Sequence, residues 1–194
     1  MKKTIVVILF ALFSACGSSG EKKAEEHADH SAHMDESAEQ PKSKSPKQMA
    51  MANMGENHIH IEYSSPSVRG RQIFGGLVGF GQVWVTGAHK ATSINFQNDV
   101  MIDEKTVPSG KYGFFTIPEK ESWTLILNKD WDMHLADEYN EANDVLRLTV
   151  TPEMLDESVE SLTYEVTPID DNSGIISISW ADTKVSFKVE NKQE

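Results

Sequence analysis

Histidines and methionines are the first residues of this chain to suggest a chemistry. His27, His30 and His33 recur at every third position, so in an extended conformation with three residues per turn their imidazoles would lie on one side. Four methionines accompany them in the same polar stretch: Met34, Met49, Met51 and Met54. Imidazole binds copper, zinc and nickel, whereas a thioether selects soft Cu(I). We therefore expect weak metal binding in this stretch, and the alternative is a polar spacer without a ligand.

A second set of histidines lies further along the chain, where strands are expected. His58 and His60 are two residues apart, so both side chains would project from the same face of a strand. His89 precedes an expected strand, and His134 lies in an expected loop beside Met133. If the fold brings the four histidines together, they form a Cu(II) or Zn(II) site with three or four ligands, copper before zinc. Otherwise His58 and His60 are surface residues at the start of a strand.

The same part of the chain offers little for an enzyme. Its serines near Pro66 show no nucleophile-elbow pattern, and it contains no cysteine. Its acidic residues around position 140 are explained by a solvated turn. We therefore do not expect an enzyme, unless a metal site with an open coordination position exists.

Two features favour a different class of function, a non-catalytic module that binds a carbohydrate or another small ligand. Trp131 lies in an expected loop, where its indole could serve as a platform for a sugar ring. Arg69 and Arg71 flank Gly70 and are candidate loop anchors first and anion contacts second. Such a binding module is the alternative to a metal-binding protein.

Period-two alternation of apolar and polar residues predicts the elements that must hold these side chains. Nine short strands are expected, separated by clusters of Gly, Pro, Asn and Asp: 58–63, 82–86, 91–96, 111–117, 123–127, 145–150, 161–166, 175–180 and 184–189. A short helical turn is expected at 137–143 or near 153–157. Strands at intervals of about ten residues predict an all-β fold, an antiparallel β-sandwich of about nine strands.

The first residues have the pattern of a secretory signal peptide. Lys2 and Lys3 precede an apolar stretch that ends at Phe13, and small residues follow. The sequence Phe13-Ser-Ala-Cys16 resembles the lipobox of bacterial lipoproteins, which implies cleavage before Cys16 and lipidation of its thiol. We expect the acyl chains to hold the protein on a membrane.

These patterns divide the chain into three parts. We expect a lipoprotein signal peptide over residues 1–15, a lipidated and disordered His/Met-rich tether over 16–56, and a folded domain over 57–194. The expected location is the cell envelope, on the outer membrane, facing either the periplasm or the cell surface. The Met/His-rich tether is similar to segments of extracytoplasmic copper-handling proteins, so another extracytoplasmic metal-handling protein is the expected partner.

Composition and charge exclude several other classes. Eighteen basic and thirty acidic residues give a net charge of −12, which repels phosphate backbones, so we expect no nucleic-acid partner. A single cysteine excludes an intramolecular disulfide and a cysteine-rich zinc or iron–sulfur site. No apolar run approaches the roughly 20 residues of a membrane-spanning helix.

Several separate blocks resemble the DUF2911 family, in the order in which that family carries them. They include Tyr63-Ser-Ser-Pro-Ser-Val-Arg-Gly-Arg-Gln-Ile-Phe-Gly-Gly-Leu-Val78, Gly81-Gln-Val-Trp84, Val107-Pro-Ser-Gly-Lys-Tyr112 and Trp180-Ala-Asp-Thr-Lys-Val-Ser-Phe187. The resemblance implies a β-sandwich domain of exported Bacteroidetes-type lipoproteins, and it implies no reaction or ligand. The chain departs from the family pattern at Val85, where Arg is usual, and at His89, where Asn is usual.

Overall fold

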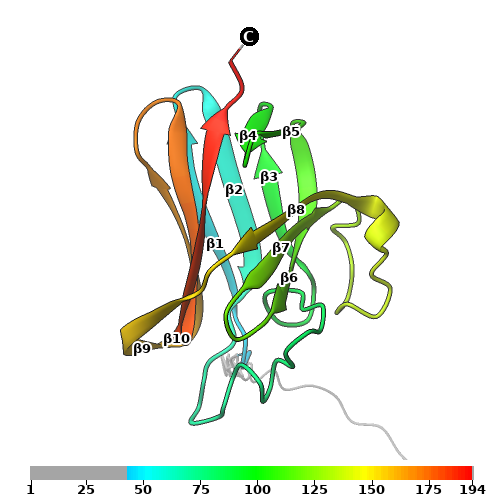
Figure 1. Ribbon diagram of the computed structural model, residues 1–194, viewed down its shortest axis with the longest axis vertical. Helices are drawn as coiled ribbons and strands as arrows, with labels where there is room; N and C mark the ends of the chain where they lie inside the picture. The colour runs from blue at the N-terminus through cyan, green and yellow to red at the C-terminus, as the bar shows by residue number, and fades with distance from the viewer. Residues whose placement is uncertain (1–42, 194) are drawn as a thin grey trace, which may run out of the picture. The chain divides into compact units, whose positions relative to one another are not determined.

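The computed structural model describes residues 43–193, which form two antiparallel β-sheets that face each other (Figure 1). The six-stranded sheet has the order β1 (Lys47–Met54), β2 (Asn57–Ser64), β3 (Thr92–Phe96), β6 (Gly110–Pro118), β7 (Trp123–Asn128) and β8 (Asp144–Val150). The four-stranded sheet has the order β5 (Lys105–Val107), β4 (Val100–Ile102), β10 (Ser173–Asn191) and β9 (Glu153–Pro168). A turn of 3₁₀ helix, η1 (Glu141–Asn143), precedes β8. The prediction of an all-β antiparallel sandwich is confirmed.

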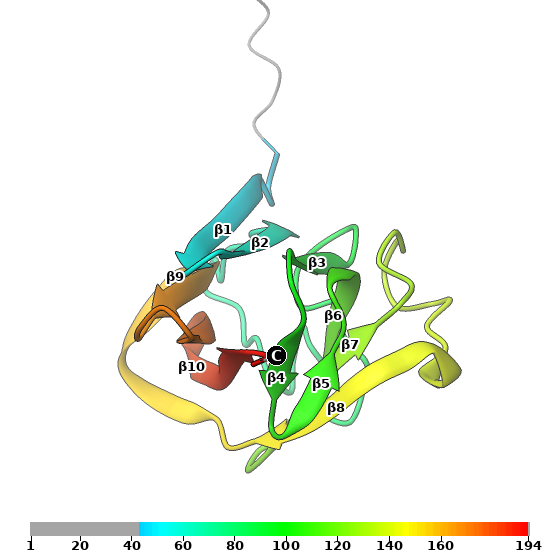
Figure 2. The ribbon, with the colours of Figure 1, turned by 90° about the horizontal axis from the view of Figure 1, so that it is seen from above.

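The main core fills the space between the two sheets. Seen from above in Figure 2, the sheets enclose an interior, and β1 of one sheet lies beside β9 of the other. Alternation places Ile59 and Ile61 of β2 in this interior, where they pack with Phe114 of β6 and Trp180 of β10. Burying each such side chain stabilises the fold by about 1.5–3 kcal/mol.

A smaller apolar cluster covers part of the outer face of the six-stranded sheet. Phe115 of β6 and Ile126 of β7 point outward and pack against Met133. The covering residues come from two long connections, the β2–β3 loop (65–91) and the β7–η1 loop (129–140). These loops therefore have a packed base against the sheet, and the outward side chains of β1 stay exposed. Among residues 43–193, no helix has the length and apolar character that crossing a membrane requires.

Most expected strands are present, and the differences have local causes. The segment 82–86 makes one isolated bridge, between Trp84 and Thr116, because the backbone turns away at Thr86, whose φ is 50°. The short strands β4 and β5 were not expected. The two strands expected at 175–180 and 184–189 are one long strand, β10, which contains a register irregularity at Ala181. The helical turn is found as η1, whereas residues near 153–157 belong to β9.

The boundary expected between tether and domain is wrong. Residues 47–54 form β1, which pairs with β2 along its whole length. Met54 is buried in the core, and Ala50 and Ala52 are half-buried, while the intervening side chains face outward. Small and flexible side chains at the inward positions let this strand pack beside β9. The domain therefore begins no later than residue 47.

Candidate functional site

The outward face of the β1–β2 hairpin gathers methionine and histidine side chains from the two strands. The antiparallel register places Met51 directly opposite His60. Two residues further along β1, and two residues back along β2, Asn53 lies opposite His58. Met49 is 60% exposed and Met51 is 47% exposed, both on this face. Directly opposed residues have Cβ atoms about 4.5–5.5 Å apart, so Met51 and His60 can reach one small ion.

The two hairpin histidines lie side by side, and one of them is oriented by a neighbour. The ring centroids of His58 and His60 are 6.1 Å apart. The Nδ1 atom of His58 lies 2.6 Å from the Oδ1 atom of Asn53. Because an amide oxygen only accepts hydrogen bonds, Nδ1 is the donor in this contact, and in the neutral imidazole the lone pair is then on Nε2. Metal-binding histidines are commonly oriented by a second ring hydrogen bond of this kind.

An ion pair borders the histidines on the same face. Lys111 of β6 donates to Glu62 Oε2 over 2.6 Å, and Glu62 Oε1 lies 3.8 Å from His60 Nε2. The hydrogen bond from Lys111 holds the pKa of Glu62 below its ordinary value, although desolvation acts in the opposite direction. Glu62 is therefore a carboxylate that is already bound to a cation beside His60.

A groove of about 310 Å³ lies next to the hairpin, between β1 and the β7–η1 loop. Trp131 forms part of its wall and is 41% exposed, and the Lys111 Nζ atom lies 4.4 Å from the centroid of its ring. Lys90 pairs with Asp132 over 2.5 Å, and this hydrogen bond lowers the pKa of Asp132. The groove thus offers an aromatic surface flanked by ion pairs, which suits a polar ligand that has one apolar face.

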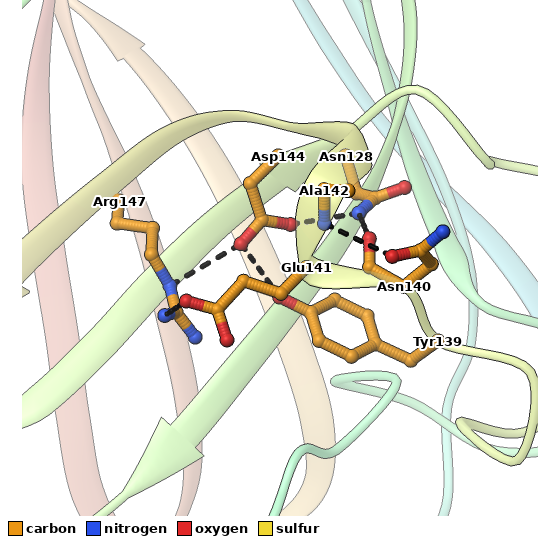
Figure 3. Close-up of polar contacts among 7 residues, drawn as sticks. All are labelled: Asn128, Tyr139, Asn140, Glu141, Ala142, Asp144 and Arg147. Carbon is orange, nitrogen blue, oxygen red and sulfur yellow. Dashed lines mark hydrogen bonds and ion pairs between the residues drawn. The ribbon is translucent and has the colours of Figure 1, made fainter.

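A polar network fixes the loop that carries Trp131 (Figure 3). Asn128, the last residue of β7, donates to the backbone oxygen of Asn140 (2.9 Å) and to Asp144 Oδ1 (2.7 Å). The Tyr139 hydroxyl donates to Asp144 Oδ2 over 2.6 Å. Burial raises the pKa of the Tyr139 phenol well above its ordinary value, and this hydrogen bond is the second-largest cause of the shift. The network therefore ties the end of the loop to the sheet.

A family comparison agrees with the domain limits seen in the structure. The family model described as "Protein of unknown function (DUF2911)" matches residues 45–189, from just before β1 to near the end of β10. The chain belongs to the DUF2911 family. Searches of curated proteins and of solved structures found no match. The early start of the family match agrees with β1 being part of the DUF2911 domain.

The DUF2911 domain does not gather its four expected histidine ligands into one centre. His89 and His134 lie on neighbouring loop segments, where the backbone N–H of Leu135 donates to the oxygen of His89 over 2.8 Å. Both side chains are exposed, and neither lies on β2. Throughout residues 43–193, no three His, Cys, Asp or Glu side chains are placed to hold one metal ion. The expected centre with three or four histidines is therefore not observed, because the histidines occupy separate elements.

The two arginines of the DUF2911 loop make backbone contacts. Arg69 donates to the oxygen of Lys44 over 2.6 Å. Arg71 donates from Nε to the oxygen of Val68 (3.1 Å) and from an Nη atom to the oxygen of Ser67 (2.6 Å). These are the hydrogen bonds of loop anchors, and both guanidinium groups retain further donors. The remaining predicted site residues lie outside the described residues: Cys16, His27, His30, His33 and Met34.

Methionines and histidines that lie in separate predicted segments of the sequence share one face in the fold. The predicted tether includes Met49 and Met51, yet the pairing of β1 with β2 places Met51 opposite His60 and Met49 opposite Glu62, on the same face as the two histidines. The signal that could have revealed this is the alternation of alanine with methionine just before the first expected strand. No comparable signal links Lys111 to this face, since β6 comes from a distant part of the sequence.

Proposed function

We propose that this DUF2911 protein is a membrane-anchored lipoprotein of the cell envelope that binds a transition metal for buffering, delivery or sensing, copper before zinc. The observation that carries the proposal is the register of the β1–β2 hairpin, which sets Met51 opposite His60 with His58 beside it. A thioether with two imidazoles is a donor set that favours soft Cu(I) over hard cations. Met49 offers a second thioether on the same exposed face.

Removing one hairpin ligand is expected to weaken Cu(I) binding at least about tenfold, which corresponds to roughly 1.4 kcal/mol. The protein to use begins at residue 43, because that chain keeps β1 and lacks the tail histidines. Met51→Leu removes the sulfur and keeps the volume and apolar character of the side chain. His60→Ala removes the opposing imidazole. Competition with a chromogenic Cu(I) chelator measures the affinity of each variant.

Met154→Leu is the matched control for the methionine variant. Met154 is 71% exposed and lies on β9 opposite Thr183, in the other sheet. His134→Ala serves in the same way for the histidine variant, since His134 is an exposed loop residue. Equal Cu(I) affinity in Met51→Leu and Met154→Leu would show that the hairpin is not the copper site.

The membrane anchor is tested separately at Cys16. Cys16→Ser is expected to remove acyl labelling and to release the protein from the membrane fraction, because Cys16 is the only cysteine that could be lipidated. Metabolic labelling with a fatty-acid analogue and membrane fractionation measure both effects. Retention of the label and of membrane association by Cys16→Ser would refute the lipobox interpretation.

A second candidate function is the binding of a carbohydrate or another small ligand in the groove beside Trp131. The groove volume of about 310 Å³ and the exposed indole support it. A sugar ring stacks on an aromatic face through its apolar C–H side, while its hydroxyl groups can bond to charged neighbours such as Asp132 and Lys90. Lys111 already contacts the Trp131 ring, so a stacked sugar would have to use the other face or displace that cation.

A further inference from the structure

A second pocket, separate from the hairpin and its groove, is lined mainly by the β2–β3 loop. Figure 1 shows this loop at one end of the sandwich. We call this pocket the end pocket. Its volume is about 390 Å³, within the range of sites for small organic ligands. The β2–β3 loop supplies most of its lining, together with Leu135 of the β7–η1 loop and Trp180 of β10. None of the hairpin methionines and histidines lines it.

The backbone around the end pocket is held in unusual conformations. Seven non-glycine residues of the described chain have positive φ, and five of them lie in this pocket or next to it. Arg69 (51°), His89 (66°) and Leu135 (57°) line the pocket. Thr86 (50°) and Ala181 (52°) are chain neighbours of lining residues. Such conformations cost on the order of 1–3 kcal/mol each and cluster at functional sites.

The strained segment at Thr86 is fixed by buried hydrogen bonds. The backbone oxygen of Thr86 accepts from the Tyr164 hydroxyl (2.7 Å) and from Thr92 Oγ1 (2.9 Å). Its own hydroxyl donates to Thr116 Oγ1 over 3.1 Å. The wall of the end pocket on either side of Thr86 is therefore preformed, which lowers the ordering cost of binding a ligand.

A buried hydrogen-bond donor among the lining residues has no partner. Trp180 is 2% exposed, and its Nε1 atom makes no hydrogen bond to the described residues. The indole stacked on it, Trp84, is satisfied, because its Nε1 donates to the oxygen of Gly87 over 3.1 Å. An unpaired buried donor costs about 1–3 kcal/mol. The Nε1 atom exposes less than 1 Å² of surface, so a ligand oxygen would reach it only after a small shift of the side chains that cover it. Trp180 also lies at the register irregularity of β10, and bulges of this kind re-aim side chains beside functional sites.

The lining of the end pocket is apolar inside and cationic at its edge. Trp84, Trp180 and Val78 contribute apolar surface, and the charged lining residues are basic: Lys44, Arg69 and Arg71. No Asp or Glu is among its lining residues, although the whole chain carries a net charge of −12. The nearby carboxylate of Glu160 accepts from the backbone N–H of Arg69 over 3.0 Å. A local positive field in an acidic protein favours an anionic ligand.

We propose that the end pocket binds a small organic carboxylate with an apolar or aromatic body. The body lies against the indoles of Trp84 and Trp180. The carboxylate is held by the free guanidinium donors of Arg69 and Arg71 and accepts the unpartnered N–H of Trp180. Charge-assisted hydrogen bonds from arginine to carboxylate are about twice as strong as neutral ones, so the charge of the ligand should dominate its selection.

The indole N–H resonance of Trp180 provides a direct readout. In ¹H–¹⁵N spectra of the chain from residue 43, assigned with Trp180→Phe, 4-phenylbutyrate is expected to shift this resonance downfield saturably at millimolar concentrations or below. The uncharged analogue 4-phenylbutanamide should bind at least about tenfold more weakly, which corresponds to roughly 1.4 kcal/mol. Arg69→Gln and Arg71→Gln should weaken 4-phenylbutyrate binding to the same extent.

Lys105→Gln is the matched control, because it makes the same charge change on β5, outside the end pocket. It should leave 4-phenylbutyrate affinity within about twofold of the parent chain. If Arg71→Gln unfolds, since its guanidinium makes two backbone contacts, Arg69→Gln decides the question. An unmoved Trp180 resonance, or equal binding of the acid and the amide, would overturn the proposal. Binding to anionic vesicles without any response to 4-phenylbutyrate would instead assign this end to a membrane contact.

Discussion

A chain that begins at residue 57 is expected to lose about 4 kcal/mol or more of its free energy of unfolding, relative to a chain that begins at residue 43. The shorter chain lacks β1, which pairs with β2 from Lys47 to Met54. Truncating a buried methionine costs about 2–5 kcal/mol by itself, and Met54 is fully buried. Urea unfolding of both chains, followed by tryptophan fluorescence, measures the difference.

The loss of β1 also exposes polar groups beyond the hairpin. The side chain of Asn191 donates to the backbone oxygen of Met54 over 2.9 Å, and Ser65 N–H donates to the oxygen of Pro46 over 2.9 Å. Removing β1 leaves both donors without these partners and turns β2 into an open sheet edge, which promotes aggregation. In the chain from residue 43, Met54→Ala should reproduce part of the loss. The same urea midpoint in the two chains would show that residues 43–56 are only a tether.

The composition of strand β1 explains why the predicted domain boundary lies after this strand rather than before it. Strands rich in β-branched and aromatic residues, such as β2, β6 and β7, were predicted because alternation and propensity agree there. In β1 the inward positions are Ala50, Ala52 and Met54, which have weak strand propensity, so composition pointed to a polar tether instead. The strand forms because β2 on one side and β9 on the other provide tertiary contacts.

The candidate sites were predictable only where they depend on local spacing. His58 and His60 share a face because they are two residues apart on one strand, and the sequence alone predicts this. The partnership of Met51 with His60 depends on strand register, which was not known in advance. The end pocket needs Trp180 to meet a loop that lies about a hundred positions earlier, and no local pattern encodes such a contact.

Asn128→Leu is expected to lower the free energy of unfolding by about 3 kcal/mol. Asn128 is fully buried and makes three hydrogen bonds: its Nδ2 donates to the oxygen of Asn140 and to Asp144 Oδ1, and its Oδ1 accepts from the N–H of Asp130 over 2.8 Å. Leucine is similar in size, so the main effect is the loss of partners for these groups rather than a cavity. Urea unfolding measures the change.

Asn143→Ala is the matched control, because it removes one solvent-exposed hydrogen bond, to Asp130 Oδ2 at 2.7 Å, from a half-buried residue of the same region. It should cost about 1 kcal/mol or less. Because Asn128 ties the β7–η1 loop to the sheet, Asn128→Leu should also broaden the Trp131 indole resonance, whereas Asn143→Ala should leave it sharp. If the two variants are equally stable, the Asn128 network does not hold this loop, and the wall of the groove beside Trp131 depends instead on the packing of Met133 against Phe115 and Ile126.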